Sequence, residues 1–174
     1  MLKLFTPNYY IHKFNALRPD YLKEHGISLL VCDIDNTLVA HDVAHPDEEV
    51  LRFLNAIKAS GIQIVFISNN VEERVKTFAK GLNIPYYPFA MKPLPKTYWR
   101  MLKDTGVKKQ QVAMLGDQLL TDVLGANLAG LHTILTAPVV ERDLACTKIN
   151  RKVEQIVFTL LKKTNRLTKG EYNE

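Results

Sequence analysis

Cysteine is scarce in this sequence, which narrows the kinds of protein that the chain can be. Only Cys32 and Cys146 occur, and they lie far apart in the chain. This number and spacing fit neither a disulfide framework nor a zinc site. Cys32 lies inside an apolar run, so we interpret it as a small buried hydrophobic residue. A reducing compartment is the simplest setting for such a chain, and we expect a cytoplasmic protein.

Long hydrophobic runs, internal repeats and low-complexity linkers are also missing. No apolar stretch approaches the roughly 20 residues that cross a bilayer. Polar or charged residues such as Lys3, Asn8 and His12 interrupt the first 16 residues. The sequence therefore predicts neither a membrane span nor a signal peptide.

The residues that are present suffice for one folded domain. Hydrophobic residues make up 47% of the 174 residues, which is enough for one continuous core. Lys and Arg outnumber Asp and Glu by 23 to 18, giving a formal net charge of +5 and a pI near 9.1. A moderate basic excess favours an anionic substrate or surface without selecting one. We predict a single domain over residues 1–174.

Short apolar runs alternate with segments of helical periodicity. The runs are typical of strands and cover residues 27–31, 62–67, 84–87, 112–115 and 131–135. The helical patterns between them cover residues 47–59, 71–79, 94–102 and 119–128, with Asn69 and Asn70 as candidate N-caps of the second. Strands that alternate with helices over short links predict a three-layer α/β/α fold with a mainly parallel sheet.

Polar residues follow three of these strands at the point where each one ends. They are Asp33 and Asp35, then the run 68–70, and finally Asp117. The carboxyl ends of parallel strands meet at one edge of the sheet, where ligands bind. Two carboxylates held that close repel each other unless a cation or a hydrogen-bond donor lies between them. The sequence therefore predicts a site at this edge.

These residues resemble the four signatures of the haloacid dehalogenase-like (HAD) phosphatases, in the order of that family. The matching stretches are the run 33–38 for the first signature, Ser68 for the second, Lys92 before Pro93 for the third, and Gly116 to Asp122 for the fourth. The resemblance covers about residues 27–140. It implies a Rossmann-like HAD core without a cap domain (C0 type), preceded by an N-terminal extension over residues 1–26.

The resemblance also implies a mechanism. Asp33 would be the nucleophile that forms an aspartyl phosphate, and Asp35 would protonate the leaving oxygen and later deprotonate the attacking water. Asp33 and Asp117 would ligate Mg²⁺ through their side chains and Asp35 through its backbone carbonyl. Because Asp33 and Asp35 are two positions apart, they can face one pocket while Ile34 packs the other way.

The remaining signature residues would contact the phosphoryl group or orient those that do. Ser68, with Asn69 beside it, would donate hydrogen bonds to phosphate, and Lys92 would offset its negative charge. We expect Asp122 to orient Lys92 or a metal-bound water, and Thr37 to cap the loop or bind phosphate.

Each signature read alone has an ordinary structural explanation. Paired acids often lie in solvated turns or act as caps, and the run 68–70 is also typical of a helix N-cap. Lys96, one helical turn beyond Lys92, is the rival for the third signature. His41 and His45 have the spacing of helical metal ligands, but Pro46 places them in a loop.

The spacing between the signatures leaves no room for a cap domain. A site open to solvent favours a large or exposed phosphorylated substrate, such as a lipid headgroup, a glycan, a protein or a nucleic-acid end. The flanks, including Pro7, the run 26–27, the run 148–151 and Glu154, look like the bacterial YqeG-type branch of subfamily IIIA. That branch is related to mitochondrial phosphatidylglycerophosphate phosphatases, which implies phosphatidylglycerophosphate as a candidate substrate.

Both ends of the chain leave alternatives open. A helix over about residues 150–163 has an apolar stripe that either packs on the domain or lies on an anionic membrane. An apolar cluster between Leu2 and Phe14 has the same two alternatives, so peripheral contact with the inner face of a membrane stays open. Residues 164–174 are expected to form a mobile tail. The sequence specifies no oligomeric state.

Two alternative functions share this scaffold. One is a basic binding protein that works in ribosome assembly or RNA contact without catalysis. The complete set of signature acids and the lack of an RNA-binding aromatic platform favour the enzyme. The other is phosphoryl transfer to an acceptor other than water, which uses the same intermediate.

Overall fold

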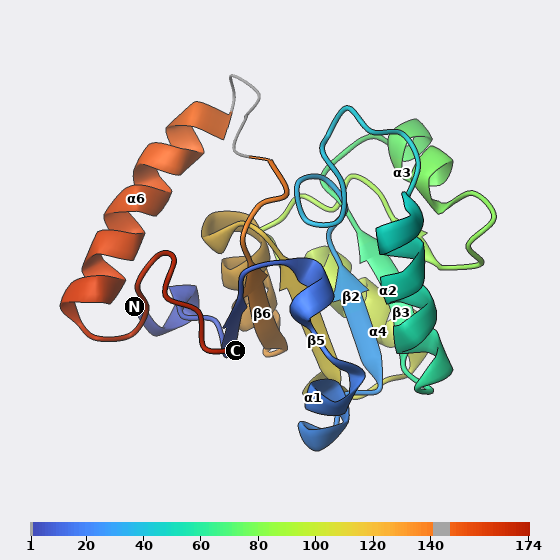
Figure 1. The fold of residues 1–174 in the computed structure, drawn as a ribbon, viewed down its shortest axis with the longest axis horizontal. Helices are drawn as coiled ribbons and strands as arrows, with labels where there is room; N and C mark the ends of the chain where they lie inside the picture. Colours follow the sequence, from blue (N-terminus) through green and yellow to red (C-terminus); the bar gives the residue numbers. More distant parts are fainter. Residues whose placement is uncertain (1, 141–146) are drawn as a thin grey trace.

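The protein is built around a six-stranded sheet. A computed structural model describes residues 2–140 and 147–174, and all strand pairs in it are parallel. The sheet order is β1-β6-β5-β2-β3-β4 (Figure 1). The strands are β1 (Tyr9–Ile11), β2 (Leu29–Cys32), β3 (Gln63–Ile67), β4 (Tyr86–Tyr87), β5 (Val112–Gly116) and β6 (His132–Thr136). The parallel α/β architecture predicted from the sequence is confirmed.

Helices cover both faces of the sheet, which gives the three layers. The α-helices are α1 (Pro19–Glu24), α2 (Glu48–Ala59), α3 (Glu72–Ala79), α4 (Lys96–Thr105), α5 (Leu124–Ala129) and α6 (Thr147–Lys163). Side chains of α1, α2 and α3 share one core cluster with Leu30, Phe66 and Leu115 of the sheet. Side chains of α4 and α5 share another cluster with Val31 and Met114. Successive strand residues point to opposite faces, so one strand serves both clusters.

Short helical turns complete the connections. They are η1 (Leu2–Phe5), η2 (Phe14–Ala16) and η3 (Lys109–Gln111), all 3-10 helices, and η4 (Leu119–Val123), a π-helix that leads into α5. Between the end of β2 and the start of β3, the chain forms a loop and α2 alone. Between β3 and the third signature, it forms α3 and β4. Within the described residues, no cap domain is inserted, as the spacing predicted.

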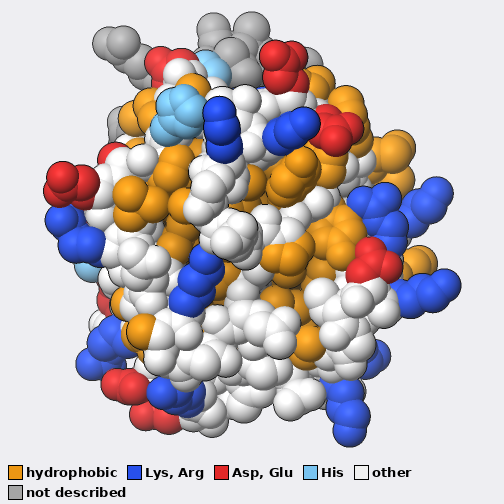
Figure 2. All heavy atoms as spheres, turned by 90° about the vertical axis from the view of Figure 1, so that its right-hand side faces the viewer, with side chains coloured by type: hydrophobic (Ala, Val, Ile, Leu, Met, Phe, Trp, Pro, Cys, Tyr) orange, Lys and Arg blue, Asp and Glu red, His pale blue; other side chains and the backbone are white. Residues whose placement is uncertain are grey.

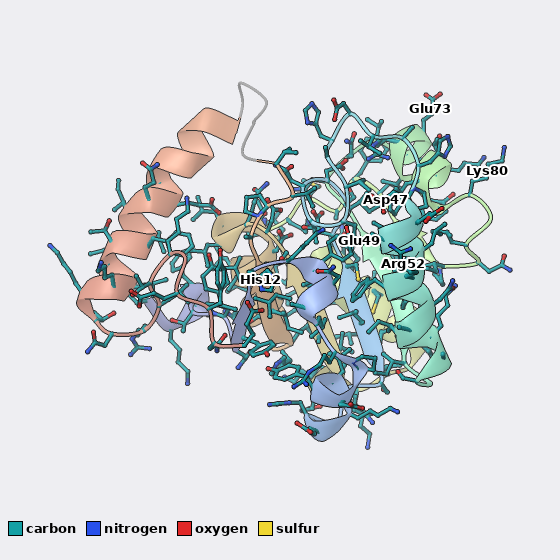
Figure 3. All side chains as sticks on the ribbon, viewed as in Figure 1. His12, Asp47, Glu49, Arg52, Glu73 and Lys80 are labelled. Atoms are coloured by element: carbon teal, nitrogen blue, oxygen red, sulfur yellow. The ribbon has the colours of Figure 1, made fainter. Side chains whose placement is uncertain are left out.

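The start of α2 follows the N-cap rules, whereas the start of α3 does not. Asp47 caps α2 by accepting a hydrogen bond from the Val50 backbone N–H at 2.8 Å, and it lies at the helix start (Figure 3). The predicted N-cap of α3 is wrong, because Val71 is the N-cap residue and gives no side-chain bond. The reason is that Asn69 and Asn70 turn toward other groups, as described below.

Strand β1 was not predicted, because it is three residues long in a segment rich in polar residues. It pairs with β6, with Tyr10 opposite Leu135. The segment that follows β1 is tied to α2, because Glu49 accepts hydrogen bonds from Lys13 at 2.6 Å and from Asn15 at 2.7 Å. Most of the N-terminal apolar cluster therefore covers the core.

Helix α6 packs one apolar face against the domain and exposes another. Val157 and Leu161 are buried with Tyr10, while the side chains of Val153, Ile156 and Leu160 are exposed. Residues after α6, predicted to be mobile, return to β1, where the Asn173 N–H donates to the Tyr10 carbonyl at 3.1 Å. In the described part of the chain, no helix is long and apolar enough to cross a bilayer.

Candidate active site

Asp33 is held at the carboxyl end of β2 by the main chain. Its N–H donates to the Leu115 carbonyl at 2.9 Å, which extends the pairing of β2 with β5 beyond the strand. Ile34 is completely buried in the core cluster that contains α2, whereas Asp33 and Asp35 contact the groups of the site. The alternation predicted for residues 33–35 is therefore present. Asn36 has a φ of 67°, a conformation that Asn tolerates better than most residues, and it turns the chain back.

Lys92 lies between two buried carboxylates. Its Nζ is 2.6 Å from Asp33 Oδ1 and 2.6 Å from Asp122 Oδ1. Burial lowers the pKa of Lys92, but the two carboxylates outweigh that effect and raise it above its usual value. The ammonium therefore stays charged. Lys96, the rival predicted from the sequence, is exposed at the start of α4.

The backbone of Lys92 is fixed by Asn69. The Asn69 side-chain oxygen accepts from the Lys92 N–H at 2.7 Å, and its amide nitrogen donates to the Lys92 carbonyl at 3.1 Å. Because both ends of this amide are engaged, the predicted contact of Asn69 with phosphate stays a prediction. The observed contacts make Asn69 the residue that joins the second signature to the third.

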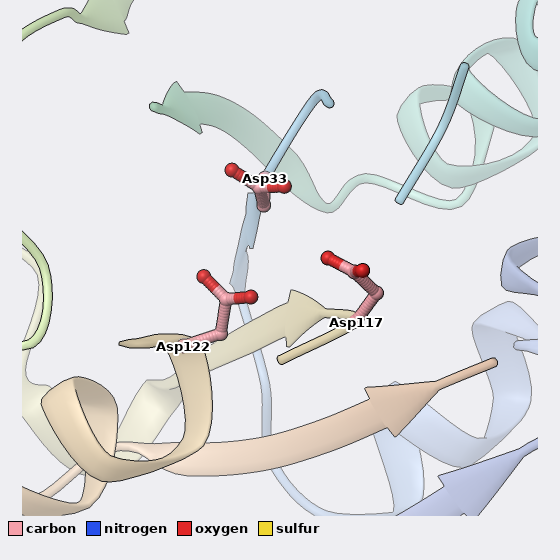
Figure 4. Close-up of side chains that lie close together, drawn as sticks. All are labelled: Asp33, Asp117 and Asp122. Atoms are coloured by element: carbon pink, nitrogen blue, oxygen red, sulfur yellow. The ribbon is translucent and has the colours of Figure 1, made fainter. Parts of the chain in front are cut away.

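Three carboxylates converge from the ends of β2 and β5 and from η4. Oxygen atoms of Asp33, Asp117 and Asp122 all lie within 4.8 Å of one another, and all three side chains point into one space (Figure 4). The Gln118 N–H donates to Asp122 Oδ2 at 3.1 Å, which holds that carboxylate in place. Gly116 makes this packing feasible, because a Cβ at that position would lie 2.3 Å from Asp122 Cγ.

The carboxylate cluster is short of positive charge. Three carboxylates face the single ammonium of Lys92, a net charge of −2 when all are ionised. Thr37 Oγ1 lies 3.0 Å from Asp33 Oδ2 and 3.2 Å from Asp117 Oδ1, but it has one hydrogen to donate. Burial and the neighbouring carboxylates raise the pKa of Asp117 well above its usual value. Burial also raises the pKa of Asp122, to about 6.

A hard divalent cation fits this donor set. Ionised carboxylate oxygens are the ligands that Mg²⁺ and similar ions prefer. A cation of charge +2 would neutralise the cluster. It would also give a ligand bond to the Asp33 and Asp117 oxygens, which otherwise share the one hydrogen of the Thr37 hydroxyl. The cluster can therefore hold a metal ion, with Asp33 and Asp117 contributing carboxylates on the side away from Lys92.

Asp35 sits in a separate set of donors. Its Oδ1 accepts from Arg74 at 2.9 Å, and its Oδ2 accepts from Asn70 at 3.3 Å and Ser68 at 3.4 Å. Burial and the charge of Asp33 raise the pKa of Asp35, although Arg74 and Asn70 oppose that shift. Sequence reasoning placed Asn70 at this edge of the sheet but missed its contact with Asp35, and it missed Arg74. Arg74 lies in the first turn of α3, and no local sequence signal marks it as a partner of Asp35.

Ser68 is buried at the end of β3. Its Oγ accepts from the Asn70 N–H at 3.0 Å, and its own hydrogen points toward Asp35. The hydroxyl thus lies within the same group of side chains as the acids. Its predicted contact with phosphate stays a prediction, as does that of Thr37.

The fold and this group of side chains define a class of enzyme. A family model for haloacid dehalogenase-like hydrolases matches residues 4–130, and the chain belongs to that family. The chain is 38% identical to the probable phosphatase YqeG of Bacillus subtilis (strain 168), over 161 residues that cover 92% of this chain and 94% of the relative. The predicted family and the likeness to its YqeG-type branch are confirmed.

Solved structures of other bacterial proteins share the fold. The cobalt-bound form of deoxy-D-mannose-octulosonate 8-phosphate phosphatase from Haemophilus influenzae superposes with a TM-score of 0.54 at 17% identity, covering 79% of this chain and 90% of that one. An uncharacterized protein from Listeria monocytogenes serotype 4b superposes with a TM-score of 0.53 at 17% identity, covering 79% and 99%. At this identity the likeness concerns the fold alone.

Proposed function

We propose that this protein is a Mg²⁺-dependent phosphomonoesterase that works through an aspartyl phosphate on Asp33. The observation that carries the proposal is the environment of that carboxylate. One of its oxygens is bound by the Lys92 ammonium at 2.6 Å and the other by the Thr37 hydroxyl at 3.0 Å, with Asp117 beside it. A buried carboxylate surrounded by donors for an anion, at the ligand-binding edge of a parallel sheet, supports a phosphoryl acceptor.

The proposed reaction has two displacements. An oxygen of Asp33 attacks phosphorus, the bond from phosphorus to the ester oxygen breaks, and protonated Asp35 gives that oxygen its proton. Asp35 then takes a proton from water, whose oxygen attacks phosphorus and releases inorganic phosphate and free Asp33. The different hydrogen-bond partners of Asp33 and Asp35 support the division of roles.

Several neighbouring side chains would assist both displacements. Lys92 offsets the negative charge that gathers between Asp33 and the phosphoryl group. Asp122 orients Lys92, and Ser68 donates to a phosphoryl oxygen. Mg²⁺, held by Asp33, Asp117 and the backbone carbonyl of Asp35, would supply charge neutralisation that lets an anionic nucleophile approach an anionic substrate.

The proposed substrate is a large or exposed phosphomonoester. The absence of an inserted cap among the described residues supports this, because in that part of the chain no additional domain lies between the signatures to enclose a small substrate. Phosphatidylglycerophosphate is the candidate that the branch resemblance suggests. A panel of phosphorylated lipids, sugars, peptides and oligonucleotides would rank it against the other classes.

The deciding experiment replaces Asp33 with Asn and measures release of phosphate from an aryl phosphate with Mg²⁺ present. We expect turnover to fall about 1000-fold or more, because the amide is a poor nucleophile. Asp42→Asn, at an exposed acid, is the matched control and should keep full activity. EDTA should silence the wild-type protein and Mg²⁺ should restore it. Equal turnover by the Asp33 and Asp42 variants would end the proposal.

A further inference from the structure

Four large hydrophobic side chains are exposed along one stretch of chain that includes Lys92. Phe89 is 58% exposed, Met91 65%, Leu94 53% and Trp99 56%. A space-filling view of the face that carries α3 and the β4 edge shows hydrophobic side chains across its middle and Lys and Arg side chains around them, several of these at the right-hand margin (Figure 2). Large apolar side chains that are exposed close together along the chain are typical of an interaction site. We call the following seven residues the mouth patch: Phe89, Met91, Leu94, Lys96, Trp99, Arg100 and Lys103.

The mouth patch is fixed relative to the acids of the site. The Phe89 N–H donates to the Asn70 carbonyl and the Ala90 N–H to the Ser68 carbonyl, both at 3.0 Å. Lys92 is held by Asn69 and reaches Asp33. The exposed side chains of Met91 and Leu94 therefore lie close in the chain to the residue that binds Asp33.

The backbone in this stretch takes an unusual conformation that leaves large side chains in solvent. Phe89 has a φ of 48° and Met91 a φ of 56°, in the left-handed region that bulky side chains rarely adopt. Burial of these side chains does not compensate for the strain, because both are exposed. Strained backbone that persists next to a functional site often serves that site.

Positive charge lies beside the exposed apolar groups. Lys96, Trp99, Arg100 and Lys103 are exposed at helical spacing i, i+3, i+4 and i+7, so they form one stripe along α4. The helix has Asp104 as its one acidic residue, and that carboxylate accepts a hydrogen bond from the Tyr87 hydroxyl at 2.9 Å. The stripe is therefore basic, and its charge complements an anionic partner.

We propose that the mouth patch docks the protein on an anionic phospholipid bilayer, with the site entrance facing the lipid. Aliphatic and aromatic tips that enter the interface, together with Lys and Arg near acidic headgroups, are the two components of peripheral membrane binding. Met91 and Leu94 argue against a nucleic acid, because bases stack on aromatic rings and not on aliphatic chains. The bilayer then shields an entrance that the chain leaves without a cap. This docking goes beyond the proposed function and does not depend on turnover.

The test uses Trp99, which is the sole tryptophan of the chain. Vesicles of phosphatidylcholine with 30% phosphatidylglycerol are compared with pure phosphatidylcholine vesicles, on wild-type protein and on Asp33→Asn. We expect both proteins to sediment with the anionic vesicles and to show a blue shift of Trp99 emission, and to do neither with the neutral ones. Because the Asp33 variant is included, a failure of docking is distinguishable from a failure of catalysis.

Variants locate the binding surface. Lys96→Gln and Lys103→Gln should each weaken binding about 5-fold, the effect of one basic residue near an anionic surface. Leu94→Ser should weaken it by a similar factor. The matched control is Ile156→Ser, on the exposed stripe of α6, where the side chain is 60% exposed, and it should leave binding unchanged. Circular dichroism of each variant confirms that it is folded.

Three results would overturn the inference. The first is wild-type protein that does not sediment with anionic vesicles. The second is binding that Ile156→Ser removes and Leu94→Ser leaves intact, which would assign the contact to α6. The third is a shift of Trp99 emission with single-stranded poly(U) RNA and none with vesicles, which would assign the surface to nucleic acid.

Discussion

Replacing Asp117 with Asn should stabilise the metal-free protein while it removes the response to Mg²⁺. Asp117 is a half-buried acid that accepts a hydrogen bond from the shared hydroxyl of Thr37. Oxygen atoms of the three carboxylates lie within 4.8 Å of one another, and two unit charges at about that separation repel by about 3 kcal/mol at an effective dielectric constant of 20. Asp117 faces two such carboxylates, Asp33 and Asp122, and Lys92 offsets roughly one of these repulsions. About 3 kcal/mol of repulsion is therefore relieved by the neutral amide, which still accepts from Thr37.

This effect depends on pH in a defined direction. The pKa of Asp117 is raised in the folded protein, so the wild type loses stability as the pH rises from the unfolded value of about 4 through the folded one. The Asn variant has no such loss. The two proteins should have similar stability near pH 4.5, and at pH 8 in EDTA the variant should melt roughly 6–12 °C higher.

Thermal unfolding followed by circular dichroism measures the difference, at both pH values and with or without Mg²⁺. The wild type should gain stability with Mg²⁺ by mass action, and Asp117→Asn should lose most of that gain. Asp42→Asn is the control for an exposed acid and should shift the midpoint by less than about 2 °C. A variant that is less stable than wild type at pH 8 in EDTA, or that keeps the full Mg²⁺ response, would refute the reasoning.

The other predictions concern the groups around this cluster. Gly116→Ala places a Cβ 2.3 Å from Asp122 Cγ. We therefore expect phosphatase activity to fall by at least about 10-fold and the melting temperature to fall. Unchanged kinetics would show that the crowding is relieved elsewhere. Lys92→Met leaves two buried carboxylates without their cation and should lower the free energy of unfolding by about 3–5 kcal/mol in EDTA. The control Lys96→Met, at an exposed lysine, should change it by less than about 0.5 kcal/mol. Equal losses of stability for the two variants in urea unfolding would contradict the position of Lys92. Because burial raises the pKa of Asp122 to about 6, the free energy of unfolding of metal-free protein should fall by about 2–3 kcal/mol between pH 4 and pH 6, and a flat profile would be inconsistent with that shift.

The sequence predicted the parts of the fold that strong local patterns specify. The apolar runs that became β2, β3 and β5 are bounded by polar residues and continuous in hydrophobicity, as buried parallel strands are. Their carboxyl ends necessarily share one edge, so the placement of Asp33, Ser68 and Asp117 at that edge followed from topology alone. The choice of Lys92 over Lys96 agrees with the geometry, because one enters the site and the other is exposed.

The partners of Asp35 could not be predicted in the same way. Arg74 reaches Asp35 across 39 positions of sequence, and its direction depends on how α3 packs on the sheet through Val75 and Phe78. Nothing in the local pattern distinguishes such an arginine from a solvated one on an amphipathic helix. The partner of Asn69 could not be predicted for the same reason. The sequence marked Asn69 as a candidate helix cap, but it binds the Lys92 backbone, which lies on another loop.

Strand β1 and helix α6 show two further features that the sequence pattern could not predict. Three residues carry too little periodicity to identify a strand, and β1 forms because β6 offers it an unpaired edge. Helix α6 has the predicted apolar stripe, but only part of the stripe contacts the domain. The rest of its apolar side chains are exposed. A pattern shows that a surface is apolar, whereas its neighbours decide whether it is covered.

Two hydrogen bonds join the Asn69 side chain to the Lys92 backbone. Because of them, the position of Lys92 does not depend on the length of the chain that connects it to Asn69. The backbone of Lys92 is held in place by Asn69, which follows the end of β3. Asn69 and Lys92 are separated by 22 residues of chain. An insertion between α3 and β4, inside that connection, would leave both hydrogen bonds in place and the ammonium group beside Asp33. The connection is therefore the point at which a lid could be grafted onto this scaffold to convert an open entrance into an enclosed one.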